Sequence, residues 1–215
     1  MEKKDFEREE EKEQYVDHMF WALRNGNFEE AAANRKKFLE LANNLDFKYY
    51  VNILFEAGNE GNVEVCKLLL NWLEEDFKNR VATLFGHPDA IYSIKKDDAA
   101  NSILQGAAFG NKKEACIFAK EQGADHFVKM LEFAAKGAHK EMCELAREWA
   151  KPPFRGAQYQ RMYWIAREQN NVELIRLAYE WGAIPVITDM PLLEDITPLP
   201  LLEESEKKEE KVACT

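Results

Sequence analysis

The sequence predicts an all-α protein built from helix–turn–helix units that stack into a solenoid. Three observations lead to this prediction. Apolar residues recur at helical spacing along most of the chain, one segment pattern recurs about six times, and Gly and Pro are sparse, at 10 and 7 of 215 residues. Because one such unit cannot bury its own apolar stripe, neighbouring units are expected to stack on one another.

The repeat is clearest in three segments that align without a gap, residues 103–124, 130–151 and 162–183. Each segment has a small apolar residue in its second half, which we call the reference residue. Shorter matches upstream give three more copies, and the six reference residues are Ala31, Cys66, Ile91, Cys116, Cys143 and Ile175. The first and third copies match least well, since polar residues follow Ala31 and Asn79 stands where the other copies have Leu or Met.

Two columns of this alignment are uniform. Nine positions before the reference residue every copy has alanine: Ala22, Ala57, Ala82, Ala107, Ala134 and Ala166. A constant alanine predicts a first helix that approaches a neighbour too closely for a larger side chain. Two positions before the reference residue every copy has an acid: Glu29, Glu64, Asp89, Glu114, Glu141 and Glu173. This acid is expected in the first turn of a second helix, at the positive end of the helix dipole.

Residues that favour turns and helix caps lie between the two helices of each copy. They are Gly26–Asn27, Gly61–Asn62, Gly86–His87, Asn111, Ala138–His139 and Asn170–Asn171. Gly123, Ala150 and Gly182 are expected to end second helices. The chain therefore divides into a charged N-terminal extension (1–14), about six repeats (15–183) and a Pro-containing acidic C-terminal tail (184–215).

These columns resemble the helical part of the ankyrin repeat, roughly L-x-x-A-A-x-x-G-H-x-E-x-V-x-L-L-x-x-G-A, and residues 130–151 match it best. The endings LAREWA (145–150) and LAYEWGA (177–183) are similar to the short, divergent ankyrin repeats of large DNA viruses such as marseilleviruses. The Thr-Pro-Leu-His opening of the family is missing from every copy. The central copies recur every 25 to 27 residues, which is less than the usual 33, so β-hairpins are expected to be shortened or absent.

The resemblance implies an interaction scaffold, in which the positions seven and six before the reference residue line a concave partner-binding face. The candidate partner-binding residues are Arg24, Asn59, Leu84, Phe85, Phe109, Lys136 and Glu168. An exposed cluster of Leu84, Phe85 and Phe109 would anchor a partner. The alternative is that the irregular third copy buries these three side chains.

The charge pattern argues against two classes of partner. The formal net charge is -10, and most of it lies in the two terminal segments, so that the repeat region has no basic surplus. Nucleic acids and anionic membranes both require such a surplus, and neither is expected as a partner. The chain also lacks a long apolar run and an apolar signal-peptide core, which predicts an intracellular, cytoplasmic location in a host cell or a virion.

No catalytic or metal site is expected, and no cofactor. Three cysteines occupy a column that Ile and Ala also fill, which favours reduced thiols in the core over metal ligands, although His139 lies four residues before Cys143. No nucleophile-elbow, phosphate-loop or dinucleotide motif occurs, so the protein is not expected to be an enzyme. Adjacent acids such as Glu75–Asp76 are interpreted as solvated, and Trp72, Trp149 and Trp181 as residues that pack the repeats.

Two questions remain open at this point. In the tail, the apolar pieces MPLL (190–193) and PLPLL (198–202) either cap the last repeat, where Tyr179 and Trp181 need cover, or form a short linear binding motif. The whole chain is expected to bind a viral or host protein as a monomer or weak homo-oligomer. The alternative is a structural component of a virus particle or another assembly.

Overall fold

The computed structural model describes the backbone of residues 2–41, 47–85 and 88–184, and the side chains of 9–41, 49–78 and 96–184. The prediction of an all-α protein is confirmed for these residues, which contain helices and no strand. The helices in chain order are α1 (Glu2–Arg24), α2 (Phe28–Leu41), α3 (Phe47–Glu60), α4 (Val63–Phe85), α5 (Pro88–Phe109), α6 (Lys113–Glu121), α7 (Phe127–Lys136), α8 (Lys140–Trp149), α9 (Gly156–Glu168) and α10 (Val172–Glu180).

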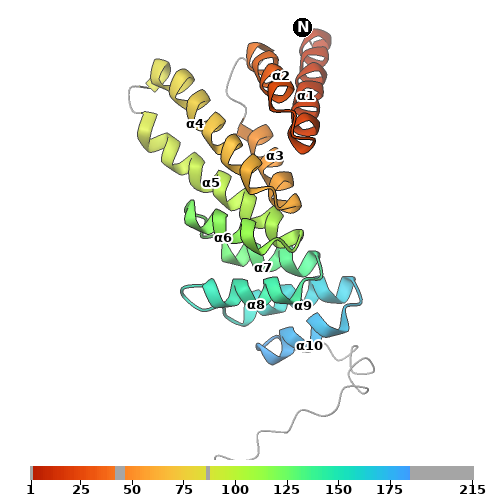
Figure 1. Ribbon diagram of the computed structural model, residues 1–215. Coiled ribbons are helices and arrows are strands. Elements are labelled where there is room, and N and C mark those ends of the chain that lie inside the picture. The colour runs from red at the N-terminus through yellow and green to blue at the C-terminus, as the bar shows by residue number, and fades with distance from the viewer. Residues whose placement is uncertain (1, 42–46, 86–87, 185–215) are drawn as a thin grey trace, which may run out of the picture.

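The helices are arranged as successive pairs along an elongated molecule (Figure 1). α1 and α2 lie at one end, and α9 and α10 lie at the other. The odd-numbered helices pack on one another in chain order, α1 on α3, α3 on α5, α5 on α7 and α7 on α9. The charged segment 1–14 was expected to be an extension, and from Glu2 onward it is helical and continuous with the rest of α1.

Five of the predicted turns share one backbone geometry. A residue with φ between 54° and 77° stands five positions before the reference residue in each of them: Gly26, Gly61, Asn111, Ala138 and Asn170. The next residue's N–H donates to the carbonyl of the column alanine at 2.8 to 3.0 Å in all five turns. This left-handed residue and its hydrogen bond are the marks of a glycine-type helix C-cap, which satisfies carbonyls at the end of the first helix. The sixth predicted turn, Gly86–His87, lies outside the described residues.

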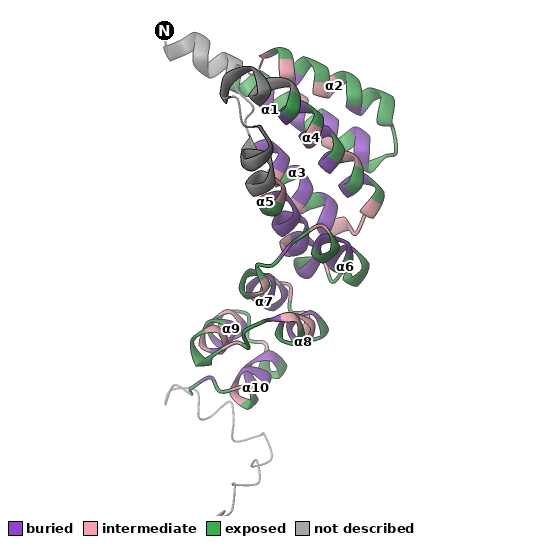
Figure 2. Ribbon diagram, turned by 90° about the vertical axis from the view of Figure 1, so that its left-hand side faces the viewer, coloured by how far each residue is buried: buried purple, intermediate pink, exposed green. Residues whose placement is uncertain are grey.

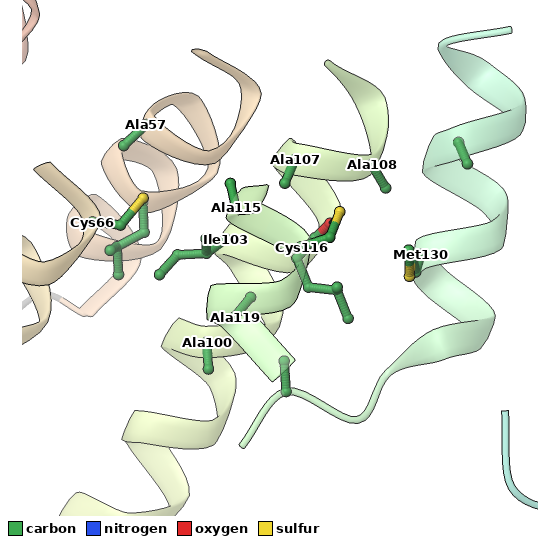
Figure 3. Packing of buried hydrophobic residues seen from close by; sticks show 14 of the residues in the cluster. Ala57, Cys66, Ala100, Ile103, Ala107, Ala108, Ala115, Cys116, Ala119 and Met130 are labelled. Atoms are coloured by element: carbon green, nitrogen blue, oxygen red, sulfur yellow. The ribbon is translucent and has the colours of Figure 1, made fainter. Parts of the chain in front are cut away.

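The two uniform columns have the surroundings that the sequence predicts. The column alanines with described side chains, in α1, α3, α5, α7 and α9, are at most 1% exposed. The column acids fall in the first turns of α2, α4, α6, α8 and α10. Figure 2 shows buried residues where helices face one another and exposed residues on the outside, and Figure 3 shows small side chains such as Ala107, Ala115 and Cys116 between the helices. Ala82, Asp89 and Ile91 of the third copy lie outside the described side chains.

The third copy differs from a separate helix–turn–helix unit. α4 continues through the boundary between the second and third copies, and α5 continues through the boundary between the third and fourth. Neither boundary contains Gly or Pro, and the Lys78 Nζ–Glu74 Oε1 ion pair (2.6 Å) adds support along α4. The third copy therefore forms the outer half of a long α4–α5 hairpin that projects to one side (Figure 1).

This hairpin leaves α3 and α5, from the second and fourth copies, in direct contact. Their backbones approach so closely that a Cβ on Gly106 would lie 1.9 Å from the carbonyl oxygen of Phe55. A Cβ on Gly58 would lie 2.4 Å from the carbonyl oxygen of Ile103. Glycine is therefore required on both helices at this crossing, because any side chain would push the helices apart.

The first helix pair is joined to the next one by a buried polar cluster of Arg35 on α2, Tyr50 on α3 and Asp76 on α4. Arg35 Nη2 lies 2.5 Å from Asp76 Oδ1 and also donates to the carbonyl oxygen of Trp72 (3.1 Å). The Tyr50 hydroxyl donates to Asp76 Oδ2, and Asp76 is only 4% exposed. The expectation that Glu75–Asp76 is a solvated pair is wrong for Asp76, because Tyr50 and Arg35 together satisfy its carboxylate away from water.

Replacing Ala138 with glycine is expected to stabilise the protein. Ala138 is exposed and has φ of 60°, a conformation that costs a side chain with a Cβ about 1 to 2 kcal/mol. Glycine removes this cost but loses more backbone entropy on folding. The free energy of unfolding, measured with denaturant, is therefore expected to rise by about 0.5 kcal/mol. The exposed, helical Ala32 is the control, because Ala32→Gly should destabilise by about 1 kcal/mol. Equal losses for both variants would contradict the turn geometry.

Candidate protein-binding face

Each odd-numbered helix leaves one stripe of side chains exposed or half-buried outside the core. The stripe occupies positions that are three or four residues apart and so share one side of a helix. On α7, for example, it runs through Lys129, Phe133 and Lys136. Because the odd-numbered helices pack on one another in order, their stripes lie next to one another. We call the surface formed by these stripes the first-helix face.

Most of the predicted partner-binding residues lie on this face. Arg24, Phe109, Lys136 and Glu168 are exposed, and Asn59 is half-buried, each at or near the C-terminal end of its helix.

Leu84 and Phe85, the other two members of the predicted cluster, are described by their backbone alone. Their side chains lie outside the described residues, but their backbone forms the end of α4, next to the start of α5. Phe109 is the last residue of the 22-residue α5, a length of about 30 Å. The backbone therefore separates the three residues that were expected to form one cluster.

The centre of the face is a cluster of three phenylalanines from three helices, which we call the aromatic cluster. The ring of Phe55 on α3 lies 6.3 Å from that of Phe109 on α5 and 5.3 Å from that of Phe133 on α7, measured between ring centroids. Phe109 is 38% exposed, and Lys136 Nζ lies 4.8 Å from the centroid of the Phe133 ring. Aromatic rings that are partly exposed at the middle of a surface are typical anchors of protein interfaces.

Charged groups next to the aromatic cluster are held by contacts between helices. Glu132 is only 5% exposed, and its carboxylate accepts from Lys129 Nζ (3.0 Å) and from Arg161 Nε of α9 (2.8 Å). Gln169 Nε2 donates to the carbonyl oxygen of Lys136 at 2.5 Å. Because two cations share one buried carboxylate, this part of the face keeps a positive charge near the rings.

Two exposed tryptophans extend the face toward both ends of the molecule. Trp21 on α1 is 60% exposed, and the neighbouring Arg24 forms an ion pair with Glu60 of α3 (Nε–Oε1 2.8 Å). Trp164 on α9 is 41% exposed, and the guanidinium of Arg167 lies 5.3 Å from its ring centroid. Large rings therefore recur on the stripe from the first helix pair to the last.

The sequence reasoning missed Phe55, Phe133 and the two tryptophans because it considered only the positions seven and six before the reference residue. Their signal is present in the columns ten and eleven positions before it, where six of the twelve positions are large and apolar: Phe20, Trp21, Phe55, Phe133, Trp164 and Ile165. These positions are three and four residues before the predicted partner-binding position, which is seven before the reference residue. On an α-helix that spacing is about one turn, so all of them lie on the same side. Aromatic enrichment on that side indicates the extent of the face.

The tryptophans of the even-numbered helices are packing residues, as predicted. A cation from the preceding even-numbered helix lies over each ring: Arg35 at 4.9 Å over Trp72, Lys120 at 4.2 Å over Trp149 and Arg147 at 4.8 Å over Trp181. Each cation stands four positions after the reference residue of its own copy. Each tryptophan stands six positions after the reference residue of the following copy. Cation–π contacts of this kind contribute about 0.5 to 1 kcal/mol at exposed sites and more where water is excluded.

The three reference cysteines lie in the core, as predicted. Cys66, Cys116 and Cys143 are free thiols that are fully buried, and burial raises the pKa of each to about 12. Since the thiolate is the reactive form, all three should resist maleimide or iodoacetamide at pH 8 and react after unfolding. Peptide mapping by mass spectrometry checks this prediction, and rapid native labelling of any of the three would contradict the buried placement.

Among the described side chains, at 9–41, 49–78 and 96–184, no group of three or more His, Cys, Asp or Glu is arranged to hold a metal ion. In that part of the chain, every helix is too short or too polar to cross a bilayer. No protein-family model, curated protein or solved structure matches the chain significantly.

Proposed function

We propose that this chain is a helical-repeat solenoid of ankyrin type and that it binds another protein through its first-helix face. Support for the repeat comes from the five turns with one geometry, the buried alanine column and the cation–tryptophan contacts that recur between even-numbered helices. Such a scaffold acts by presenting an extended surface that no single helix pair could supply.

The observation that carries the binding proposal is the aromatic cluster. Phe55, Phe109 and Phe133 come from three helices that are separated in sequence, and they meet on an exposed surface. Phe109 is exposed and the other two rings are half-buried, so together they offer apolar surface that could supply the anchors of an interface. Fixed cations beside the rings favour a partner surface that combines apolar and acidic residues.

The test compares two substitutions at sites of equal exposure. Phe109 is 38% exposed on the first-helix face, and Ile117 is 39% exposed on α6. Tagged full-length protein with Phe109→Glu should lose its partner in affinity capture from expressing cells followed by mass spectrometry, whereas Ile117→Glu should retain it. The expected loss in affinity is about 30-fold, corresponding to a contribution of about 2 kcal/mol from an anchor residue.

Two results decide the interpretation of this experiment. Circular dichroism and the melting temperature should be the same for both variants, since each adds a charge at a partly exposed site. A partner that remains bound to Phe109→Glu and is lost from Ile117→Glu would place the interface on the even-numbered helices and contradict the proposal.

A further inference from the structure

The C-terminal tail leaves the last helix pair beside the first-helix face. The N–H of Ala183 donates to the carbonyl oxygen of Ala178 (2.9 Å), and the N–H of Ile184 donates to Gln160 Oε1 (2.8 Å). Gln160 lies four residues before Trp164 on α9, so the two side chains lie on the same side of that helix. Residues 185–215, which lie outside the described residues, therefore start next to the stripe that bears Trp164.

The composition of the tail complements this face. Residues 190–204 contain the apolar pieces MPLL and PLPLL together with four acids and no base. On α7 and α9 the face carries four cations and two carboxylates, and one of these carboxylates, Glu132, is already shared by Lys129 and Arg161. Apolar residues with acids between them are the chemistry that the aromatic cluster and its cations would bind.

The two aromatic residues at the C-terminal end of the last helix pair, Tyr179 and Trp181, already pack against other side chains, so they do not require the tail to bury them. The ring of Trp181 has Arg147 at 4.8 Å on the preceding even-numbered helix and the ring of Tyr159 at 5.6 Å. The ring of Tyr179 packs at 5.4 Å from that of Tyr163. Since both terminal rings have neighbours within the last helix pairs, the reason for placing the tail over the end is weakened.

The tail is also long enough to reach the aromatic cluster. Adjacent packed helices lie about 8 to 10 Å apart, so the path from α9 across α7 to α5 and α3 is about 30 Å. Thirteen extended residues, such as 190–202, span about 40 Å. The five residues between Ile184 and Met190 add further reach.

From these observations we propose that residues 190–204 bind the first-helix face of the same chain and compete with its protein partner. The two apolar pieces lie against Phe133 and Phe109, and the acids face Lys136 and Lys129. This inference rests on the proposed function for the identity of the competitor. The contact between tail and face is tested without any partner.

The test uses full-length protein and a fluorescein-labelled peptide of residues 188–204. In the tail variant, Leu192→Asp and Leu201→Asp weaken the internal segment, and Val212→Asp outside the segment is the control. A tethered segment acts at an effective concentration of about 1 mM, so with a peptide Kd of about 0.1 mM it occupies about nine-tenths of the face in the wild type. The peptide should then bind the tail variant about tenfold more tightly than the wild type or the control, measured by fluorescence anisotropy. Adding Phe109→Glu to the tail variant should abolish binding, and adding Ile117→Glu should not.

Three results would overturn the proposal. One is equal peptide affinity for the wild type and the tail variant. Another is peptide binding that persists with Phe109→Glu, which would place the tail at another surface, such as the end of the last pair. The third is a wild-type dimer that becomes monomeric in the tail variant by light scattering, because the tail would then bind a second copy. Peptide binding that depends on Phe109, with partner capture that does not, would refute the proposed function and leave the tail contact intact.

Discussion

Replacing Gly106 with alanine is expected to lower the free energy of unfolding by about 3 kcal/mol. The new Cβ would lie 1.9 Å from the carbonyl oxygen of Phe55, so α3 and α5 must separate by more than an ångström. The separation opens gaps around Ile103 and Ala107, which are fully buried at this contact. The steric cost outweighs the gain of up to about 1 kcal/mol that alanine gives over glycine in a helix.

Gly156→Ala is the matched control for this prediction. Gly156 is also helical, as the first residue of α9, and a Cβ there would meet its nearest atom, the carbonyl oxygen of Gly182, at 3.5 Å, an ordinary contact. Its unfolding free energy should change by less than about 0.5 kcal/mol. Chemical denaturation measures both variants, and a Gly106→Ala protein as stable as the wild type would mean that the two helices do not cross so closely.

The turns and the core of each pair could be predicted from sequence because local chemistry determines them. Only residues that tolerate positive φ fit the place five positions before the reference residue, and Gly or Asn occupies four of the five described turns. The column alanine is constant because its side chain is buried between helices, where a larger side chain would not fit. Its carbonyl, which any residue would supply, closes the turn. These constraints act within about ten residues, so a single sequence reveals them by repetition.

The position of the third copy could not be predicted in this way. Its columns match the other copies, but the missing helix breakers at both of its boundaries let α4 and α5 run on as continuous helices. The direct contact of α3 with α5 then depends on Gly58 and Gly106, which are 48 residues apart in the sequence. The spacing of Gly106 and Gly110 was the available signal for a close helix crossing, although it does not identify the partner helix.

The candidate site was predicted only in part for a related reason. The sequence identified a column that is exposed, including Phe109 and Lys136, since helical periodicity determines which side of a helix leaves the core. It did not identify Phe55 and Phe133 as neighbours of Phe109. Those contacts depend on which copies stack directly, and the projecting third copy changes that order.

Asp76→Ala is expected to destabilise the protein by about 3 kcal/mol. The substitution leaves the largely buried guanidinium of Arg35, whose side chain is 15% exposed, without its closest carboxylate, and it leaves the hydroxyl of the 2% exposed Tyr50 without an acceptor. Removing one partner of a buried ion pair typically costs about 3 to 5 kcal/mol, and the remaining contact of Arg35 with Glu75 (3.2 Å) offsets part of this loss. Denaturant unfolding, followed by circular dichroism, measures the change.

Glu75→Ala is the matched control, since Glu75 contacts the same guanidinium but its side chain is 61% exposed. An exposed ion pair contributes at most about 1 kcal/mol, so this variant should remain close to the wild type. Combining Arg35→Met, Tyr50→Phe and Asp76→Leu removes every polar group of the cluster and should recover most of the stability that Asp76→Ala loses. If Glu75→Ala were as damaging as Asp76→Ala, the exposed carboxylate rather than the buried one would be the group that joins the first helix pair to α4.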